Sequence, residues 1–86
     1  MDERCKKLQF RAWRRGFREI DLILGGFADR NLAALEPEGL AQFERLLDAP
    51  DQLAYAWIVG FEPAPEEYDT PILEAIRAFV LGDRTR

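Results

Sequence analysis

Apolar side chains recur every three or four positions along this chain, in short segments separated by glycine and proline. One segment carries a full helical face of five apolar residues: Ile20, Ile23, Leu24, Phe27 and Ala28. No segment alternates apolar and polar residues as a half-buried strand does, and threonine is rare. The spacing therefore predicts an all-α fold, a compact bundle of short helices.

The same spacing divides the chain into five short helical segments. They are residues 2–14, 19–28, 36–47, 51–59 and 71–81. Residues 61–69 contain two prolines and three glutamates, and this composition predicts a solvated loop without a metal site. One domain is expected over residues 1–86, with residues 1–7 and 83–86 as candidates for fraying.

Residue types that begin and end helices set the expected boundaries. Pro37 fits the first position of the third helix, where its missing N–H is not needed. The side-chain oxygens of Asp51 and Thr70 can cap the helices that follow them. Gly60 and Gly82 are expected to end the fourth and fifth helices.

Glycines near the first and second helices carry further expectations. Gly16 follows a basic turn and is expected to close the first helix in the left-handed conformation. Gly25 and Gly26 each weaken the second helix by about 1 kcal/mol relative to alanine. We expect close packing against a neighbouring backbone to explain these two residues.

Aromatic residues outside the loops divide into core and surface candidates. Trp57 and Phe43 sit on apolar helical stripes and are expected in the core. Trp13 can serve either the core or a partner surface. Tyr55 and Tyr68 lie off the best stripes and are expected to be exposed.

The absence of histidine and the single cysteine, Cys5, exclude several classes of protein. One cysteine forms neither an internal disulfide nor a Cys-x-x-Cys redox pair. Without histidine the chain has no Ser-His-Asp or Cys-His nucleophile and no histidine metal ligand. We therefore expect no catalytic residues, no bound metal and no enzyme activity.

Charge is unevenly distributed along the chain. Residues 1–19 hold seven bases and three acids, whereas residues 20–86 hold five bases and thirteen acids. A basic first segment favours an anionic partner, but the net charge of −4 argues against nucleic acid. The balance indicates a protein partner or a solvated surface.

Nothing in the sequence indicates a membrane or secretory segment. No run approaches the roughly 18 apolar residues that a membrane helix needs. The first residues lack the apolar stretch of a secretory signal and lead directly into a patterned helix. We expect a cytoplasmic protein, with a monomer as the default.

The junction of the first two helices concentrates charge around one glycine. It contains Arg14, Arg15, Gly16, Arg18, Glu19 and Asp21. Arginine forks suit carboxylates and phosphates on a partner, and a glycine permits close approach. An alternative needs no partner: Gly16 only ends a helix, and Arg15 pairs with Glu19 at the surface. Spacing alone leaves both interpretations open.

Two patterns resemble a known family. Residues 15–19 read Arg-Gly-x-x-Glu, preceded by Arg14 and followed by Asp21. Residues 43–47 read Phe-Glu-Arg-Leu-Leu, and an acidic turn and a helix carrying Trp57 follow. Both patterns resemble those of the succinate dehydrogenase assembly factors of the SdhE type.

The resemblance covers residues 8–80 and implies a five-helix bundle that assists another protein. Family members bind the flavoprotein subunit of succinate dehydrogenase, in bacteria often that of fumarate reductase, and promote covalent attachment of FAD to it. FAD would then belong to the client and would not bind tightly here. Glu36 departs from the family pattern, because serine or threonine often caps the third helix there.

The resemblance also implies a partner-binding surface at the junction. Arg15, Gly16 and Glu19 lie at its centre, with Arg14, Arg18 and Asp21 beside them. We expect the side chains of Arg15 and Glu19 to point outward and pair with client charges.

Two rival functions remain open. One is a direct FAD carrier, although the chain lacks the Gly-x-Gly-x-x-Gly loop of a dinucleotide site. The other is an antitoxin-like or regulatory protein-binding module, which the basic first helix also fits.

Overall fold

The computed structural model describes the backbone of residues 3–84 and the side chains of residues 3–82. The elements are α1 (Glu3–Ala12), α2 (Arg18–Asn31), the 3-10 turn η1 (Leu32–Ala34), α3 (Pro37–Asp48), α4 (Asp51–Val59), the 3-10 turn η2 (Glu66–Tyr68) and α5 (Pro71–Arg84). The described range contains no strand, so the predicted all-α fold of five helices is confirmed.

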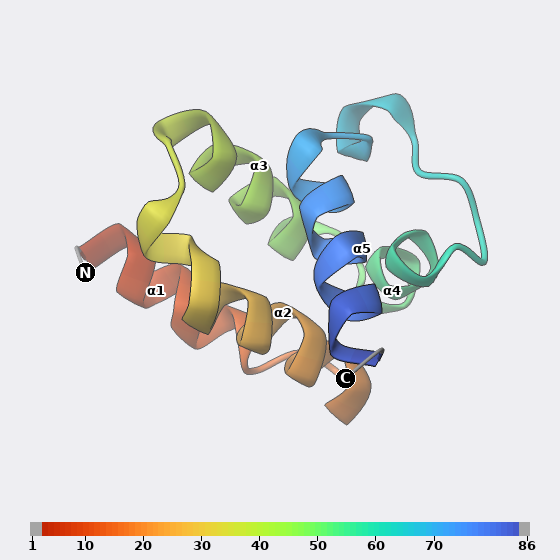
Figure 1. The fold of residues 1–86 in the computed structure, drawn as a ribbon, viewed down its shortest axis with the longest axis horizontal. Coiled ribbons are helices and arrows are strands. Elements are labelled where there is room, and N and C mark those ends of the chain that lie inside the picture. Colours follow the sequence, from red (N-terminus) through yellow and green to blue (C-terminus); the bar gives the residue numbers. More distant parts are fainter. Residues whose placement is uncertain (1–2, 85–86) are drawn as a thin grey trace.

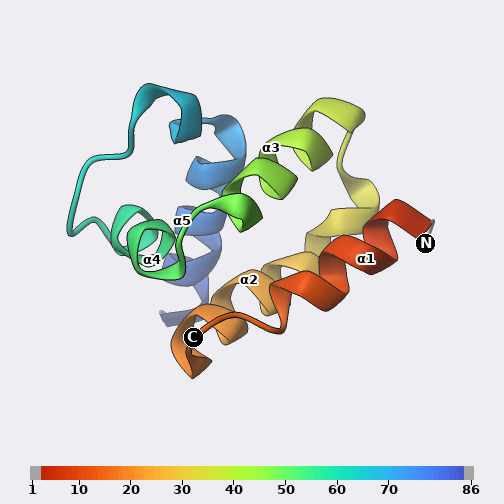
Figure 2. The ribbon, with the colours of Figure 1, turned by 180° about the vertical axis from the view of Figure 1, so that it is seen from behind.

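The helices form a compact bundle. Figure 1 shows α1 and α2 side by side and antiparallel, and Figure 2 shows the same pair from behind. α5 packs against α2, α3 and α4, while α1 contacts both α2 and α3. The α1–α2 pair and the α3–α4–α5 group therefore share one core.

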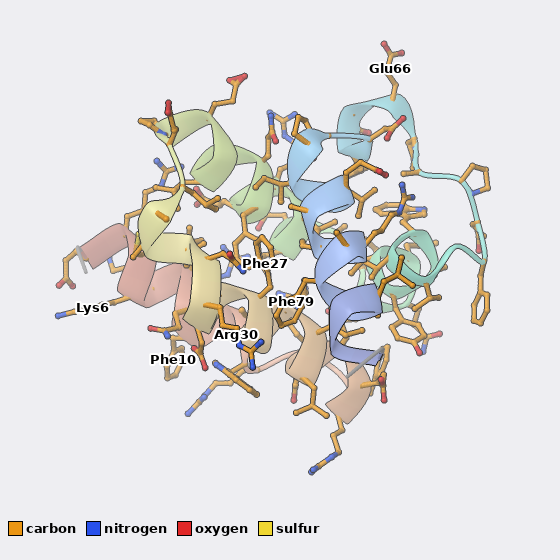
Figure 3. The ribbon with its side chains drawn as sticks, viewed as in Figure 1. Lys6, Phe10, Phe27, Arg30, Glu66 and Phe79 are labelled. Carbon is orange, nitrogen blue, oxygen red and sulfur yellow. The ribbon has the colours of Figure 1, made fainter. Side chains whose placement is uncertain are left out.

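The core consists of apolar side chains from all five helices and from η1. The largest fully buried ones are Leu8, Ile20, Leu24, Leu32, Phe43, Leu73 and Ile76. The Phe27 ring lies 5.9 Å, centroid to centroid, from both the Phe43 ring and the Phe79 ring. Phe27 and Phe79 point toward one another between α2 and α5 (Figure 3). This aromatic group joins α2 to α3 and α5.

Three of the predicted boundary signals are confirmed. Pro37 is the first residue of α3, and Glu36 precedes it without a capping side-chain hydrogen bond. The Thr70 hydroxyl accepts a hydrogen bond from the Leu73 amide at 3.3 Å, as an N-cap does. Gly60 ends α4 with φ of 89°, a left-handed conformation that glycine adopts without steric strain.

Other predicted boundaries are wrong. α1 ends two residues early, and α2 continues three residues beyond Ala28. α5 continues through Gly82 to Arg84, because Gly82 does not take the left-handed conformation that would stop a helix. The range expected to fray is also helical in part: residues 3–7 lie in α1 and residues 83–84 in α5. Residues 1–2 and 85–86 lie outside the described residues.

The predicted burial of the aromatic residues is likewise correct for some residues and wrong for others. Trp57 and Phe43 are buried, as predicted. Tyr68 is half-buried and stacks on Trp57, with ring centroids 4.7 Å apart. Tyr55 is also half-buried and meets the Phe17 ring edge to face. The predicted exposure of both tyrosines is wrong, because Tyr68 stacks on Trp57 of α4 and Phe17 of the α1–α2 turn packs against Tyr55.

Candidate functional site

Residues 13–17 form a sharp turn between α1 and α2. The amides of Trp13 and Arg14 bond to the carbonyls of Phe10 and Arg11, three residues back, at 3.3 and 3.1 Å. This tightened turn ends α1 before Gly16 is reached. Gly60 is the one described residue with positive φ, so the left-handed conformation predicted for Gly16 is wrong. We call residues 13–21 the corner.

The Arg15 side chain is held inside the corner, with 10% of its surface exposed. Its Nε donates to Asp51 Oδ1 at 2.7 Å, and its Nη2 donates to the Leu47 carbonyl at 2.7 Å. A longer contact of 3.4 Å joins Nη2 to the Ala49 carbonyl. The last carbonyls of a helix lack intrahelical partners and lie at its negative end, so a guanidinium suits them. The expectation that Arg15 points outward is wrong.

Two carboxylates fix the backbone of the corner. Asp21 Oδ1 accepts the Arg15 amide at 2.6 Å, and Asp51 Oδ2 accepts the Gly16 amide at 2.6 Å. Asp51 therefore binds both the Arg15 side chain and the Gly16 backbone. Hydrogen bonds to a charged acceptor are stronger than neutral ones, so the corner is rigidly attached to α4.

Asp51 was predicted as a helix cap, and this prediction is wrong. Pro50 occupies the cap position of α4, and Asp51 is the first helical residue. Its carboxylate is favoured there by the helix dipole, but it turns to the corner instead of to its own helix. Sequence alone carries no signal for this pairing, because 36 residues separate Asp51 from Arg15.

The remaining charged residues of the corner face solvent. Arg14 is exposed, and its guanidinium carbon lies 3.9 Å from the centre of the Phe10 ring. Arg18 and Glu19 are exposed, and neither side chain makes a hydrogen bond or ion pair with another described side chain. The alternative surface pair between Arg15 and Glu19 is not formed. The expectation of an outward Glu19 is confirmed.

Trp13 attaches the corner to α2. Its indole Nε1 donates to Asp29 Oδ1 at 3.1 Å, and Gln9 Nε2 donates to the same oxygen at 2.5 Å. The indole covers Gly25 so closely that a Cβ there would lie 2.2 Å from the ring. The Phe79 ring lies over Gly26 less closely, because a Cβ there would lie 3.3 Å from it. Aromatic side chains, and not the expected backbone, therefore pack against both glycines, and the overlap is severe only at Gly25.

An open groove of about 580 Å³ begins at the corner and continues along α4. Its lining includes Gly16 and Phe17 of the corner, Tyr55 of α4, and Phe61, which follows α4. Phe61 is 78% exposed, and its ring meets the Tyr55 ring edge to face. The groove adds apolar surface beside the exposed charges of the corner.

Within residues 3–84 no helix has the length and apolar character needed to cross a membrane. Among the side chains that the structure describes, the cysteine and the carboxylates form no group of three or more that can hold a metal ion.

Comparisons with known proteins agree on one family. The family model described as flavinator of succinate dehydrogenase matches residues 6–80. The FAD assembly factor SdhE of Acetobacter pasteurianus is 40% identical over 70 residues, which cover 81% of this chain and 64% of the relative. The mitochondrial succinate dehydrogenase assembly factor 2 of Dictyostelium discoideum is 36% identical over 78 residues, covering 91% of this chain and 55% of the relative.

A third relative, the mitochondrial succinate dehydrogenase assembly factor 2-A of Drosophila yakuba, is 32% identical over 82 residues. The match covers 93% of this chain and 51% of that protein. The chain thus spans between about half and two thirds of the length of these relatives. The matched region covers more than four fifths of this chain in each of the three relatives.

Proposed function

The chain belongs to the family of flavinators of succinate dehydrogenase, and we propose that it is an assembly factor for that enzyme. In this proposal it binds the flavoprotein subunit and promotes covalent attachment of FAD to it. The related flavoprotein of fumarate reductase is proposed as a second client. The protein acts in the cytoplasm, as a monomer before it meets the client.

The observation that carries the proposal is the family match over residues 6–80, which includes the whole corner. Relatives at 32–40% identity carry names that describe assembly of succinate dehydrogenase or of its FAD. The corner supports the same function, because a rigid charged turn beside an apolar groove suits recognition of a protein surface.

In this proposal the residue that receives FAD belongs to the client, and the contribution of this chain is binding. An assembly factor that binds the client most tightly in the conformation with flavin and nucleophile aligned raises the population of that conformation. Alignment of reacting groups alone lowers a barrier by several kcal/mol.

The six predicted site residues, which all lie in the corner, divide between two roles in the proposal. Glu19, Arg14 and Arg18 are exposed and pair with charges on the client. The Gly16 backbone lies among them, also exposed. Arg15 and Asp21 act from within, because the Arg15 guanidinium binds Asp51 of α4 and the Asp21 carboxylate binds the Arg15 amide.

A flavinylation assay with one matched pair of variants tests the proposal. In cells that lack this gene, we expect weak in-gel flavin fluorescence of the succinate dehydrogenase flavoprotein, restored by the wild-type chain. Glu19→Ala should fail to restore it. Glu38→Ala is the control, because Glu38 is likewise the second residue of a helix and exposed. Equal fluorescence with and without the wild-type gene would refute the proposed function.

A further inference from the structure

Gly16 sits against a carboxylate that leaves no room for a side chain. A Cβ built on Gly16 would lie 2.7 Å from Asp51 Oδ2 and 3.6 Å from Asp51 Cγ. Real Cβ atoms essentially never approach another heavy atom as closely as the first of these distances. Gly16 does not have positive φ, so its backbone conformation is open to other residues. Size, and not conformation, therefore restricts this position to glycine.

The obstructing carboxylate is not free to move aside. Asp51 Oδ2 accepts the Gly16 amide at 2.6 Å, while Oδ1 accepts the Arg15 Nε at 2.7 Å. Arg15 is in turn held by the Leu47 carbonyl at the end of α3. Displacing the carboxylate breaks its charge-assisted hydrogen bonds and leaves the nearly buried guanidinium without its counter-ion.

We propose that Asp51 is a positioning residue of the partner-binding surface, and that Gly16 is required because any larger residue displaces the Asp51 carboxylate. The inference rests on the proposed function, since it concerns the same surface. It assigns a role to a residue of α4 that lies outside the Arg-Gly-x-x-Glu sequence. Asp51 acts through the shape of the corner and does not contact the client.

The route from Asp51 to the exposed charges is short. Asp51 holds the Gly16 amide, and Asp21 on α2 holds the preceding amide of Arg15. Glu19 lies on the first turn of α2, between Gly16 and Asp21 in sequence. The two carboxylates therefore fix the position of the first turn of α2 relative to α4. They thereby also fix the direction of the Glu19 side chain.

A double-mutant cycle separates this role of Gly16 from direct contact with the client. The measured quantity is the Kd of the purified succinate dehydrogenase flavoprotein for wild type, Gly16→Ala, Asp51→Ala and the double variant. We expect each single change to weaken binding about tenfold or more, the scale of a lost hydrogen bond to a charged group. In the double variant, Gly16→Ala should add less than about a twofold further loss, because the carboxylate it displaces is already gone.

The opposite result is equally clear. If Gly16 serves by letting the client approach, Gly16→Ala weakens binding by the same factor whether or not Asp51 is present. Such additivity would overturn the inference. Asp48→Ala is the matched control, because Asp48 is the last residue of α3, pairs with the half-buried Arg11 of α1 and is 66% exposed. Binding by this variant should stay within about twofold of wild type.

Hydrogen exchange in the free protein tests the role of Asp51 without any client. In the free protein we expect slow hydrogen exchange of the Gly16 amide and a large loss of protection in Asp51→Ala, with Asp48→Ala unchanged. Unchanged protection in Asp51→Ala would contradict the inference. If Asp51→Ala does not fold, Asp51→Ser takes its place, since its shorter side chain also clears Gly16. Failure of wild type to bind the flavoprotein would refute the proposed function, whereas exchange would still decide the role of Asp51.

Discussion

Three ion pairs run along the seam where α1 and the corner meet α3 and α4. They are Arg4–Glu44, Arg11–Asp48 and Arg15–Asp51, with N–O distances of 3.1, 2.7 and 2.7 Å. At the first two pairs each side chain is 39–66% exposed, whereas Arg15 and Asp51 are 10% and 24% exposed. The second and third pairs share one distance and differ in surroundings.

This difference shows that the N–O distance of an ion pair does not determine how much the pair contributes to stability. Arg11 binds a carboxylate in water, where competition from solvent leaves a net contribution of about 0–1 kcal/mol. Arg15 binds a shielded carboxylate and two backbone carbonyls, and that same carboxylate holds the next amide of the chain. The two exposed pairs on α1 therefore add charge to the surface, whereas the Arg15–Asp51 pair fixes the backbone of the corner.

The largest expected effect comes from breaking the shielded pair. Arg15→Ala should lower the free energy of unfolding by about 2–4 kcal/mol, because it leaves a partly buried carboxylate and a helix-end carbonyl without their partner. Arg11→Ala removes an ion pair of equal length and should lower it by no more than about 1 kcal/mol. Urea unfolding of both variants measures the difference. Equal decreases in the free energy of unfolding would mean that burial does not make the Arg15–Asp51 pair stronger than the Arg11–Asp48 pair.

A smaller effect is expected where Trp13 attaches the corner end of α1 to α2. Gly25→Ala should destabilise the protein by about 1–3 kcal/mol, because the new methyl group overlaps the indole ring. Gly39→Ala is the control, since its Cβ would meet its neighbours at ordinary distances of 3.5 Å or more. That variant should be neutral or up to about 1 kcal/mol more stable, through better helix propensity. Thermal unfolding compares the two, and a stabilised Gly25→Ala would contradict the close packing described here.

The smallest expected effect is the response of the two pairs to salt. Between low salt and about 1 M NaCl the Debye length falls to roughly 3 Å, which screens exposed charges far more than shielded ones. In about 1 M NaCl, the decrease in unfolding free energy caused by Arg11→Ala should therefore approach zero. The decrease caused by Arg15→Ala should keep more than half of its low-salt value. Repeating the urea series at both salt concentrations tests this. Parallel shrinkage of both losses would show that water reaches the Arg15–Asp51 pair freely.

The sequence predicted the helical core well and the ends of the helices less well. The five-residue apolar face on α2 is buried, because a 3.6-residue period leaves one face for the core. Gly60 and Gly82 look alike in sequence, yet only Gly60 ends a helix. A glycine permits a left-handed turn without requiring one, so tertiary packing decides which glycine takes it.

The sequence indicated where the corner lies but not how its side chains are arranged. The cluster around Gly16 indicated a corner, and the exposure of Glu19 was predicted. The inward direction of Arg15 was not, because its acceptors on α3 and α4 lie more than 30 residues away. Asp51 was misread for the same reason. Local helix signals predict a cap there, but the Asp51 carboxylate instead accepts hydrogen bonds from the Arg15 side chain and the Gly16 amide.

The most direct test of the internally held corner is the coupling energy between Arg15 and Asp51. We would measure the free energy of unfolding of wild type, Arg15→Ala, Asp51→Ala and the double variant of the free protein. A shared, shielded pair should give non-additive losses, with a coupling of about 2 kcal/mol or more, within the range known for contacting groups. Losses that simply add would contradict the account, because Arg15 and Asp51 would then act independently, whereas an internally held corner requires them to act as a pair.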